Sequence, residues 1–167
     1  MIKFLNQKLI KMKKLLLAIV VIIFTGVTVN AQSKFSIAAN VGTGTYAGSK
    51  LTYGADLQVD VPASKSFKVT GSAGYENYSF KYTYGTTSGT INSGVIPVLV
   101  GGKVNLGSMF YLHGQLGYGF FTESGAGGHF AYAPSLGYSL GNKLDLSAKY
   151  LKISDLGAIV LRLALGL

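Results

Sequence analysis

Two histidines are the side chains best suited to acid–base chemistry in this sequence, which has no cysteine. His129 shares a glycine-rich segment with Ser124 and Glu123, and acyl hydrolases and acyltransferases use these three residue types together. The neighbouring glycines do not fix the geometry of the three side chains, and His113 belongs to a different segment. We therefore predict no catalytic site and keep a lipid-modifying enzyme only as an alternative.

The same residues do not predict a metal or cofactor site. Two isolated histidines lack the ligand spacing of a zinc site. The run Gly125-Ala126-Gly127-Gly128 is followed neither by Lys and Ser or Thr nor by a helical pattern, so it does not predict a phosphate-binding loop. We expect no cofactor and no metal.

Eight charged residues recur on the polar side of alternating segments, and they are the other candidates for chemistry. Their signs balance, since four are acids and four are bases: Asp56, Asp60, Lys68, Glu76, Lys103, Asp145, Lys149 and Arg162. Charges in a dry interior are tolerated when they are paired. We predict an ion-pair network that fills the interior, with Asp60 directly opposite Lys68. The alternative, a proton or ion path, needs continuous water that a narrow interior rarely holds.

The segments that position these residues alternate apolar and polar side chains with a period of two, as strands with two unlike faces do. The pattern is clearest in residues 130–140 and 144–150, where the even positions are apolar. Pairing Leu140 with Leu144 leaves the three-residue loop Gly141-Asn142-Lys143, a common tight hairpin.

Repetition of this unit predicts an all-β fold, an eight-stranded antiparallel up-and-down transmembrane β-barrel. The expected strands are 35–41, 51–61, 67–76, 95–104, 110–120, 130–140, 144–150 and 158–167. Strands of about 10 residues suit a tilted crossing of a bilayer. Tight turns follow the second, fourth and sixth strands, and longer loops follow the first, third and fifth. This alternation is typical of bacterial outer-membrane barrels.

The first 31 residues have the composition of a secretory signal peptide. Five lysines precede the apolar run 15–24, and Val29-Asn30-Ala31 supplies small residues at a cleavage site. We predict cleavage between Ala31 and Gln32, which leaves residues 32–167 as one barrel domain. The apolar run is short for a membrane-spanning helix, which needs about 20 residues. An uncleaved anchor is the alternative.

Cleavage also changes what the net charge implies. The whole chain has 15 Lys and Arg against 6 Asp and Glu, a formal net charge of +9. Residues 1–31 hold five of the basic residues and none of the acids, so the mature chain carries 10 − 6 = +4. The smaller positive charge of the mature chain removes most of the argument for nucleic-acid binding.

Two features favour an apolar side that faces lipid. The polar side carries mostly small residues, as the narrow interior of an eight-stranded barrel requires. Aromatic residues lie near the strand ends like two interfacial girdles: Phe35, Phe67, Phe110 and Tyr138 at one end, and Tyr53, Tyr75, Tyr118, Tyr132 and Tyr150 at the other. The alternative is a secreted or periplasmic soluble barrel that holds a small apolar ligand among inward-facing aromatic residues.

Two irregularities interrupt the pattern. After Glu76 the bulky residues move to even positions, which predicts either a bulge or an exit from the apolar layer. We favour the exit, with residues 85–93 as a polar tip. Pro97 and Pro134 lie inside strands, and each predicts a bulge because proline lacks a ladder donor.

The bulky residues after Glu76 are also the best candidates for contact with an external ligand, because tyrosine combines a large area with a polar tip. They are Tyr78, Phe80, Tyr82 and Tyr84. The alternative is that they form a girdle or a strand extension above the membrane.

The segments VIPVLVGGKVNLG, MFYLHGQLGYGFF and APSLGYSLGNKLDLSAKY resemble the small outer-membrane β-barrel domain family of Gram-negative bacteria, the OmpX/OmpA-barrel type. In that family a Pro-x-x-x-Tyr strand leads through a short turn into a Leu-x-Leu strand, and the resemblance covers essentially the whole mature chain. It implies a monomer in outer-membrane lipid, inserted by the barrel-assembly machinery. It also implies a structural or surface-interaction role through the outer loops, without a wide pore.

The sequence departs from that family in two respects. It ends in Leu167, where an aromatic residue is usual. No sequence for a peptidoglycan-binding domain follows the barrel, so the tethering role of larger relatives is not expected.

Overall fold

The computed structural model describes residues 33–84, 87–123, 127–141 and 143–167. The chain divides into two units, Met1–Ala31 and Gln32–Leu167. The boundary between the two ranges falls at the predicted cleavage position in the sequence. Ala31 and Gln32 lie outside the described residues, so the signal peptide stays a prediction. No helix within the described ranges is both long and apolar enough to span a membrane.

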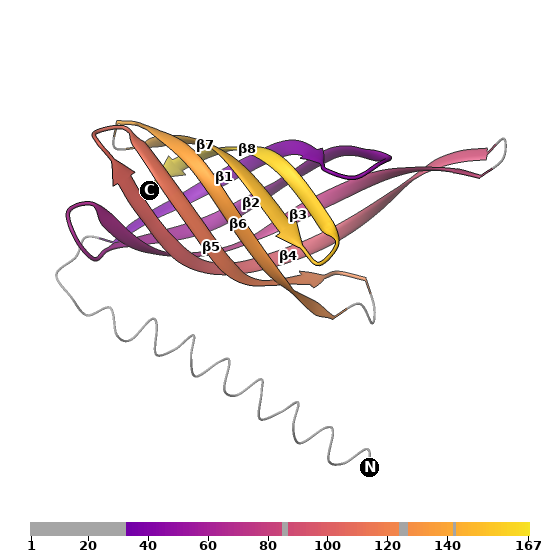
Figure 1. Cartoon of the computed structure of the whole chain (residues 1–167), viewed down its shortest axis with the longest axis horizontal. Helices are drawn as coiled ribbons and strands as arrows, with labels where there is room; N and C mark the ends of the chain where they lie inside the picture. The colour runs from indigo at the N-terminus through magenta and orange to yellow at the C-terminus, as the bar shows by residue number, and fades with distance from the viewer. Residues whose placement is uncertain (1–32, 85–86, 124–126, 142) are drawn as a thin grey trace, which may run out of the picture. The chain divides into compact units, whose positions relative to one another are not determined.

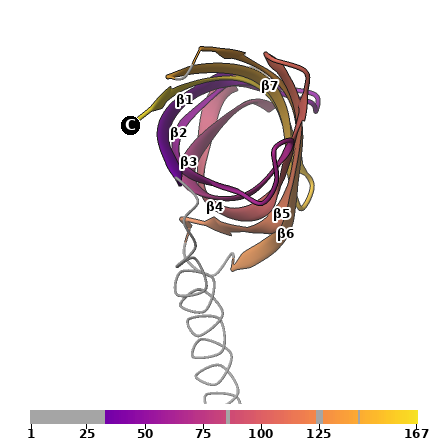
Figure 2. The ribbon, with the colours of Figure 1, turned by 90° about the vertical axis from the view of Figure 1, so that its left-hand side faces the viewer.

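The described part of the second unit consists of eight antiparallel strands, each paired with its neighbours in chain order (Figure 1). The last strand pairs with the first, so the sheet closes into a barrel (Figure 2). The predicted up-and-down topology is confirmed. The strands are β1 (Lys34–Gly44), β2 (Ser49–Pro62), β3 (Phe67–Tyr84), β4 (Thr87–Leu106), β5 (Phe110–Phe121), β6 (Gly128–Leu140), β7 (Leu144–Ile153) and β8 (Leu156–Gly166).

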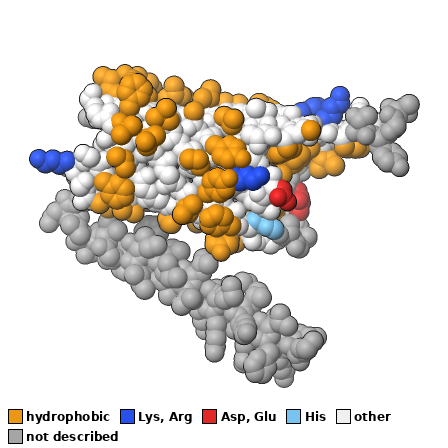
Figure 3. All heavy atoms as spheres, in the orientation of Figure 1, with side chains coloured by type: hydrophobic (Ala, Val, Ile, Leu, Met, Phe, Trp, Pro, Cys, Tyr) orange, Lys and Arg blue, Asp and Glu red, His pale blue; other side chains and the backbone are white. Residues whose placement is uncertain are grey.

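One face of each strand points away from the barrel and carries most of the large apolar side chains. In β8 the side chain of Leu161 is 56% exposed, whereas its neighbour Arg162 is 5% exposed. Hydrophobic side chains spread over the visible face of the barrel, and few charged ones lie among them (Figure 3). The predicted orientation is confirmed for the large apolar residues, most of which face outward, and for the charged residues predicted to face inward, most of which are buried. It is the reverse of a soluble barrel, which hides its apolar face.

The aromatic residues predicted to flank this surface lie on the outside near the strand ends. Phe110 and Tyr138 pack edge to face near one end, with ring centroids 4.9 Å apart. The ring centroids of Tyr132 and Tyr150 lie 6.2 Å apart near the other end. Such rings suit the boundary between hydrocarbon and water, because one end of tyrosine is apolar and the other is polar.

The hairpin between β6 and β7 has the predicted register, with Leu140 opposite Leu144. Gly141 opens the turn at φ 71°, a left-handed conformation that favours glycine. The hairpin between β2 and β3 differs from the prediction. Asp60 lies opposite Thr70, not Lys68, because the turn lies one residue further along the chain than predicted. Pro62 pairs with Lys68, and within the turn the Ser64 hydroxyl accepts the backbone N–H of Phe67.

The predicted polar tip at residues 85–93 is mostly strand. β3 and β4 continue past the ends of the other strands as a hairpin, with Phe80 opposite Ile91 and Tyr82 opposite Gly89 (Figure 1). Each strand then has nearly twice the length that crosses a bilayer. The sequence pattern did not predict this strand, because the segment is rich in Gly, Ser and Thr, yet each residue from Thr87 to Ser93 has a ladder partner on β3.

β3 has no bulge after Glu76, but it leaves the ring of the barrel there, because the pairing of β4 with β5 ends at Val95, which lies opposite Glu76. This course is in line with the favoured exit. Even-numbered residues keep facing inward, so Tyr78 is fully buried and Phe80 packs against the buried apolar cluster. The irregularity lies in β2 instead, where the register to β3 shifts between Ser49 and Thr52. The phase change in the sequence therefore reflects which face carries the large residues. They lie on the outward face up to Tyr75 and on the opposite face from Tyr78.

The predicted bulges at Pro97 and Pro134 are absent. The β3–β4 ladder pauses beside Pro97 and resumes in the same register, since Ala73 pairs with Val98 and Glu76 with Val95. The β6–β7 ladder likewise pauses beside Pro134, between the pairs of Tyr132 and Ser135. A proline removes one donor on one side of its strand, and the other side stays paired in both strands.

A charge placed on the outer face tests whether that face meets hydrocarbon. We expect Leu161→Arg, in the middle of β8, to lower the free energy of unfolding in phospholipid vesicles by roughly 2–4 kcal/mol. The matched change Leu140→Arg, at the end of β6, should cost roughly 0–1 kcal/mol, because an arginine there reaches the interface. Urea titrations of the refolded variants measure both. Equal losses at the two positions would contradict a lipid-facing surface.

Candidate functional site

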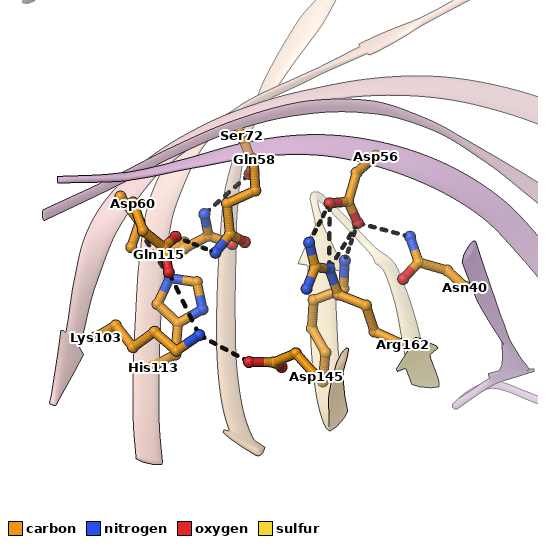
Figure 4. Close-up of polar contacts among 12 residues, drawn as sticks. Asn40, Asp56, Gln58, Asp60, Ser72, Lys103, His113, Gln115, Asp145 and Arg162 are labelled. Carbon is orange, nitrogen blue, oxygen red and sulfur yellow. Dashed lines mark hydrogen bonds and ion pairs between the residues drawn. The ribbon is translucent and has the colours of Figure 1, made fainter. Parts of the chain in front are cut away.

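The middle of the barrel interior holds a cluster centred on Arg162 of β8 and Asp56 of β2 (Figure 4). The Arg162 guanidinium donates to both carboxylate oxygens of Asp56, with Nη2 2.7 Å from Oδ1. Lys149 of β7 lies 3.6 Å from Asp56 and 3.8 Å from Glu76. Asn40 of β1 donates to both acids, at 3.0 Å and 2.6 Å. Two acids and two bases therefore neutralise each other in a dry environment.

A second cluster surrounds Lys103 of β4, nearer the tight turns (Figure 4). Its ammonium lies 3.1 Å from Asp145 and 3.5 Å from Asp60, and 3.8 Å above the ring of Tyr111. Asp145 also accepts the Tyr111 hydroxyl, and Ser139 donates to it at 3.1 Å. Each carboxylate is thus held by several donors, which a buried charge needs to be stable.

The interior is narrow, and two of its large side chains lie opposite a glycine. Tyr111 lies across from Gly137 in the β5–β6 ladder, and a β-carbon at position 137 would overlap its ring. Glu76 lies across from Gly54 in the same way, on β3 and β2. These two glycines therefore create the space for one member of each cluster.

The interior near the longer loops is apolar, and the sequence analysis missed it. Tyr78, Leu151 and Ile153 are its largest fully buried side chains, and Phe80, Phe121 and Leu156 pack against it. The complete buried set is Tyr78, Val95, Leu99, Ala131, Ala133, Leu151, Ile153, Ala158 and Val160. Outer-membrane barrels usually have a polar interior, so this layer closes the bore without any charge.

The tight-turn end of the barrel has an opening of about 600 Å³, lined by Asp60, Lys68 and Ser139 among others. A cavity of about 30 Å³ lies beside the Lys103 cluster, and Lys34, Gln58 and Lys68 also line it. That volume holds roughly two water molecules. The structure therefore has room for local hydration at the tight-turn end.

The other exposed feature is the β3–β4 hairpin, together with the β1–β2 loop that supports it. Tyr46 of this loop stacks on Phe80 with ring centroids 5.1 Å apart, and burial raises the pKa of Tyr46 to about 12. The backbone N–H of Lys81 donates to the carbonyl of Gly48 at 2.8 Å. Lys50 donates to the Thr90 hydroxyl at 3.1 Å. The loop and the first residues of β2 thus hold the base of the hairpin, through Phe80 and Lys81 of β3 and Thr90 of β4.

The predicted charge network is largely present, with one exception. Seven of its eight members lie in the two clusters: Asp56, Asp60, Glu76, Lys103, Asp145, Lys149 and Arg162. Lys68 only lines the cavity and makes no recorded ion pair within the described part of the chain, because the β2–β3 register moves it beyond Asp60. The prediction for Lys68 is therefore wrong.

The four residues predicted to contact an external ligand have different outcomes. The prediction for Tyr78 is wrong, because this side chain is buried inside the barrel, and Phe80 is half-buried against Tyr46. Tyr82 is 45% exposed on the hairpin and remains a candidate. The side chain of Tyr84 lies outside the described part of the structure.

The sequence analysis also missed Asn40 and Tyr111 as members of the clusters. Both lie at inward positions of their strands, so the period-two pattern could have found them if neutral polar residues had been counted with the charges. His113 shares a hydrogen bond of 2.8 Å with Thr70, and His129 packs edge-on against Phe121. No group of three or more acidic or histidine residues among those described is placed to hold a metal ion.

The barrel is similar to solved transmembrane barrels. Ail, the attachment invasion locus protein of Yersinia pestis, crystallised with the heparin analogue sucrose octasulfate, aligns over 83% of this chain and 98% of its own at 20% identity, with a TM-score of 0.56. Ail in a phospholipid bilayer nanodisc aligns over 81% of this chain and 100% of its own, at 19% identity and a TM-score of 0.52. The fold is that of a small outer-membrane β-barrel.

This agrees with the fold implied by the OmpX/OmpA-type resemblance. A transmembrane β-barrel designed de novo also aligns, over 80% of this chain and 95% of its own, at 12% identity and a TM-score of 0.53. No family model matches the chain. No curated protein matches it either. The similarity therefore concerns the fold, and the function has to be argued from the residues of this chain.

Removal of one partner from the Arg162 cluster tests its structural role. Asp56→Ala leaves the guanidinium buried without its carboxylate, so we expect a loss of about 3–5 kcal/mol in the free energy of unfolding. Asp155→Ala, in the exposed β7–β8 turn, should change it by less than about 0.5 kcal/mol. The double change Asp56→Leu with Arg162→Met should recover a large part of the loss, because Lys149 keeps Glu76. Unfolding curves in vesicles measure these free energies. An Asp56→Ala variant as stable as the unchanged protein would contradict a buried ion-pair network.

Proposed function

We propose that this protein is an integral outer-membrane β-barrel of a Gram-negative bacterium that acts through its exposed loops and hairpin and does not serve as a wide pore. The observation that carries the proposal is the inversion of its two faces, with leucines such as Leu161 outside and the Arg162–Asp56 pair inside. Such a surface is stable in hydrocarbon and would aggregate in water. The predicted signal peptide provides the route of export.

The connections indicate which end faces outward. Both ends of the barrel chain, near Lys34 and Gly166, lie beside the turns after β2, β4 and β6. Outer-membrane barrels keep short turns in the periplasm and longer connections outside the cell. The β3–β4 hairpin therefore extends into the external medium. Its eight β4 residues beyond the β5 pairing span roughly 25 Å at about 3.3 Å per residue.

A sealed interior supports a role at the surface. The apolar layer around Tyr78 and Leu99 and the two ion clusters fill successive levels of the bore. Bulk water and solutes have no continuous path through such a packed interior. The proposal therefore includes no transport of solutes.

External binding has a precedent in a protein of the same fold, since Ail was crystallised with a heparin analogue. In this chain, Tyr82 and Ile91 are both about half exposed on one face of the hairpin. Exposed apolar side chains on a supported, polar-rimmed element are typical of interaction surfaces. Insertion by the barrel-assembly machinery and a monomeric state are parts of the same proposal.

The two alternatives have less support. A soluble barrel that binds an apolar ligand needs its aromatic residues inside, whereas most of them face outward here. We also propose no enzymatic role, because His113 is engaged with Thr70 in the interior and His129 packs against Phe121.

Epitope insertion tests both the location and the orientation. We expect an epitope inserted between Tyr84 and Thr87 to be labelled by antibody on intact Gram-negative cells. The same epitope inserted between Leu140 and Leu144 should be labelled only after the outer membrane is permeabilised. Fractionation and a heat-dependent shift in gel mobility check that each variant is a folded membrane protein. Recovery of the protein in the soluble fraction, or labelling of both sites on intact cells, would contradict the proposal.

Planar bilayer recordings test the closed interior. We expect the refolded protein to show no steady ionic current, because the apolar layer excludes hydrated ions. A stable, open current from protein with a heat-shifted gel mobility would show that the interior is not closed.

A further inference from the structure

The mouth of the barrel at the tight-turn end is rich in lysine. The charged residues that line its opening of about 600 Å³, among those described, are three lysines and one acid: Lys34, Lys68, Lys143 and Asp60. The lysines come from distant parts of the chain, since Lys34 begins β1, Lys68 lies at the start of β3 and Lys143 lies in the β6–β7 turn. Closure of the barrel brings them to one rim.

The acids nearest to this mouth are engaged by cations of the interior. The Lys103 ammonium lies 3.5 Å from Asp60 and 3.1 Å from Asp145, so it is held between the two carboxylates (Figure 4). Asp60 also lies directly opposite Lys34 in the β1–β2 ladder. Neither acid is therefore reserved for the other lysines of the rim.

Lys68 has a neighbour of the same charge. It lies directly opposite Lys103 in the β3–β4 ladder and opposite Pro62 in the β2–β3 ladder. Like charges directly opposite each other destabilise a sheet. Lys103 has its two acids, whereas Lys68, which is half-buried, forms no ion pair within the part of the chain that the structure describes. A negative charge beside Lys68 would relieve this repulsion.

The side-chain charges at this level of the barrel do not cancel. The mouth and the small cavity behind it hold four lysines against two acids, a net charge of +2: Lys34, Lys68, Lys103 and Lys143 against Asp60 and Asp145. The Arg162 cluster deeper inside is neutral by itself, with two acids and two bases. A carboxylate at Leu167, which also lines the opening, would offset one of the positive charges. An anion that enters from the water can balance the rest.

The groups on the rim suit a phosphate. Lysine presents a compact point charge with three donors, which fits the several oxygens of a phosphate, whereas a flat carboxylate is matched best by arginine. Asn105 and Ser108 add neutral donors to the same opening. The volume is sufficient for a phosphate together with its ester group, since small-molecule sites typically measure about 300–1,000 Å³.

We propose that the mouth at the tight-turn end binds the phosphate group of an anion that approaches from the periplasm, with Lys68 and Lys143 as its principal contacts. The periplasmic approach rests on the proposed orientation of the barrel, and the site itself does not. A soluble phosphate ester and a phospholipid headgroup offer the same chemistry. Phe110 lines the opening and is exposed on the outer face beside Tyr138, so the rim reaches the level of lipid headgroups.

Titration with inorganic phosphate tests the site. The protein is extracted from membranes and exchanged into maltoside micelles, which contain no phosphate, and the amide signals of Asn105 and Gly107 are followed by NMR at constant ionic strength. We expect these signals to shift and saturate. Lys68→Gln and Lys143→Gln should each weaken binding at least about fivefold, because each removes a unit charge beside the anion.

Lys65→Gln is the matched control, because it removes the same charge from the exposed β2–β3 turn at the same end of the barrel, outside the lining of the opening. It should bind phosphate within about twofold of the unchanged protein. Lys68→Arg keeps the charge and should also bind within about twofold, so a loss in Lys68→Gln alone reports the charge. A heat-dependent shift in gel mobility checks that each variant is folded.

Micelles with and without added phosphatidylglycerol distinguish the two sources of phosphate. If a headgroup is the ligand, phosphatidylglycerol shifts the same two signals, displaces inorganic phosphate and loses its effect in Lys68→Gln. If a soluble ester is the ligand, glycerol 3-phosphate shifts the signals and phosphatidylglycerol does not compete with it. Either result supports the site and identifies its ligand.

Other results overturn the inference. These are the absence of a saturable shift, equal binding by Lys68→Gln, and an equal loss in Lys65→Gln and Lys68→Gln. Binding of acetate without binding of phosphate would identify a carboxylate ligand and would also overturn it. Phosphate binding by the extracted protein does not depend on which end of the barrel faces outward. Its failure therefore leaves the outcome of epitope display unchanged, and the two proposals can fail separately.

Discussion

Closure of the sheet is the constraint on which the rest of the structure depends. In hydrocarbon each backbone N–H and C=O must be bonded within the protein, and a sheet achieves this only when its first and last strands pair. β1 and β8 do so from Ser36 opposite Gly166 to Gly44 opposite Ala158. Interruptions such as those beside Pro97 and Pro134 are tolerated because the register on both sides of the gap is unchanged.

Closure with eight strands leaves a narrow interior, and the interior residues follow from that limit. Charges in the interior are held by opposite charges, as in the pairing of Arg162 and Lys149 with Asp56 and Glu76. Large side chains need small residues opposite them, as Tyr111 needs Gly137 and Tyr78 lies between Thr52 and Ser93. The remaining half is packed with apolar side chains, so the interior serves the stability of the barrel and leaves recognition to its exposed end.

The same constraint lapses where β3 and β4 leave the ring. Beyond Val95 the hairpin has two edges again, and edges in water attract further strands. The β1–β2 loop covers one of them through Gly48 and Tyr46, and the other is open from Thr87 to Ser93.

The sequence alone determined the strand number, the outward and inward faces and the register of the β6–β7 hairpin. A period of two assigns each residue to a face without knowledge of its neighbours, and Leu140 and Leu144 admit one tight loop. Only the tertiary structure decided how far β3 and β4 extend, where Asp60 lies relative to Lys68, and that Tyr78 is buried. These features depend on the cross-strand register and on the volume left by facing residues such as Gly54. Pairing between strands sets both, and the local alternation of the sequence does not encode them.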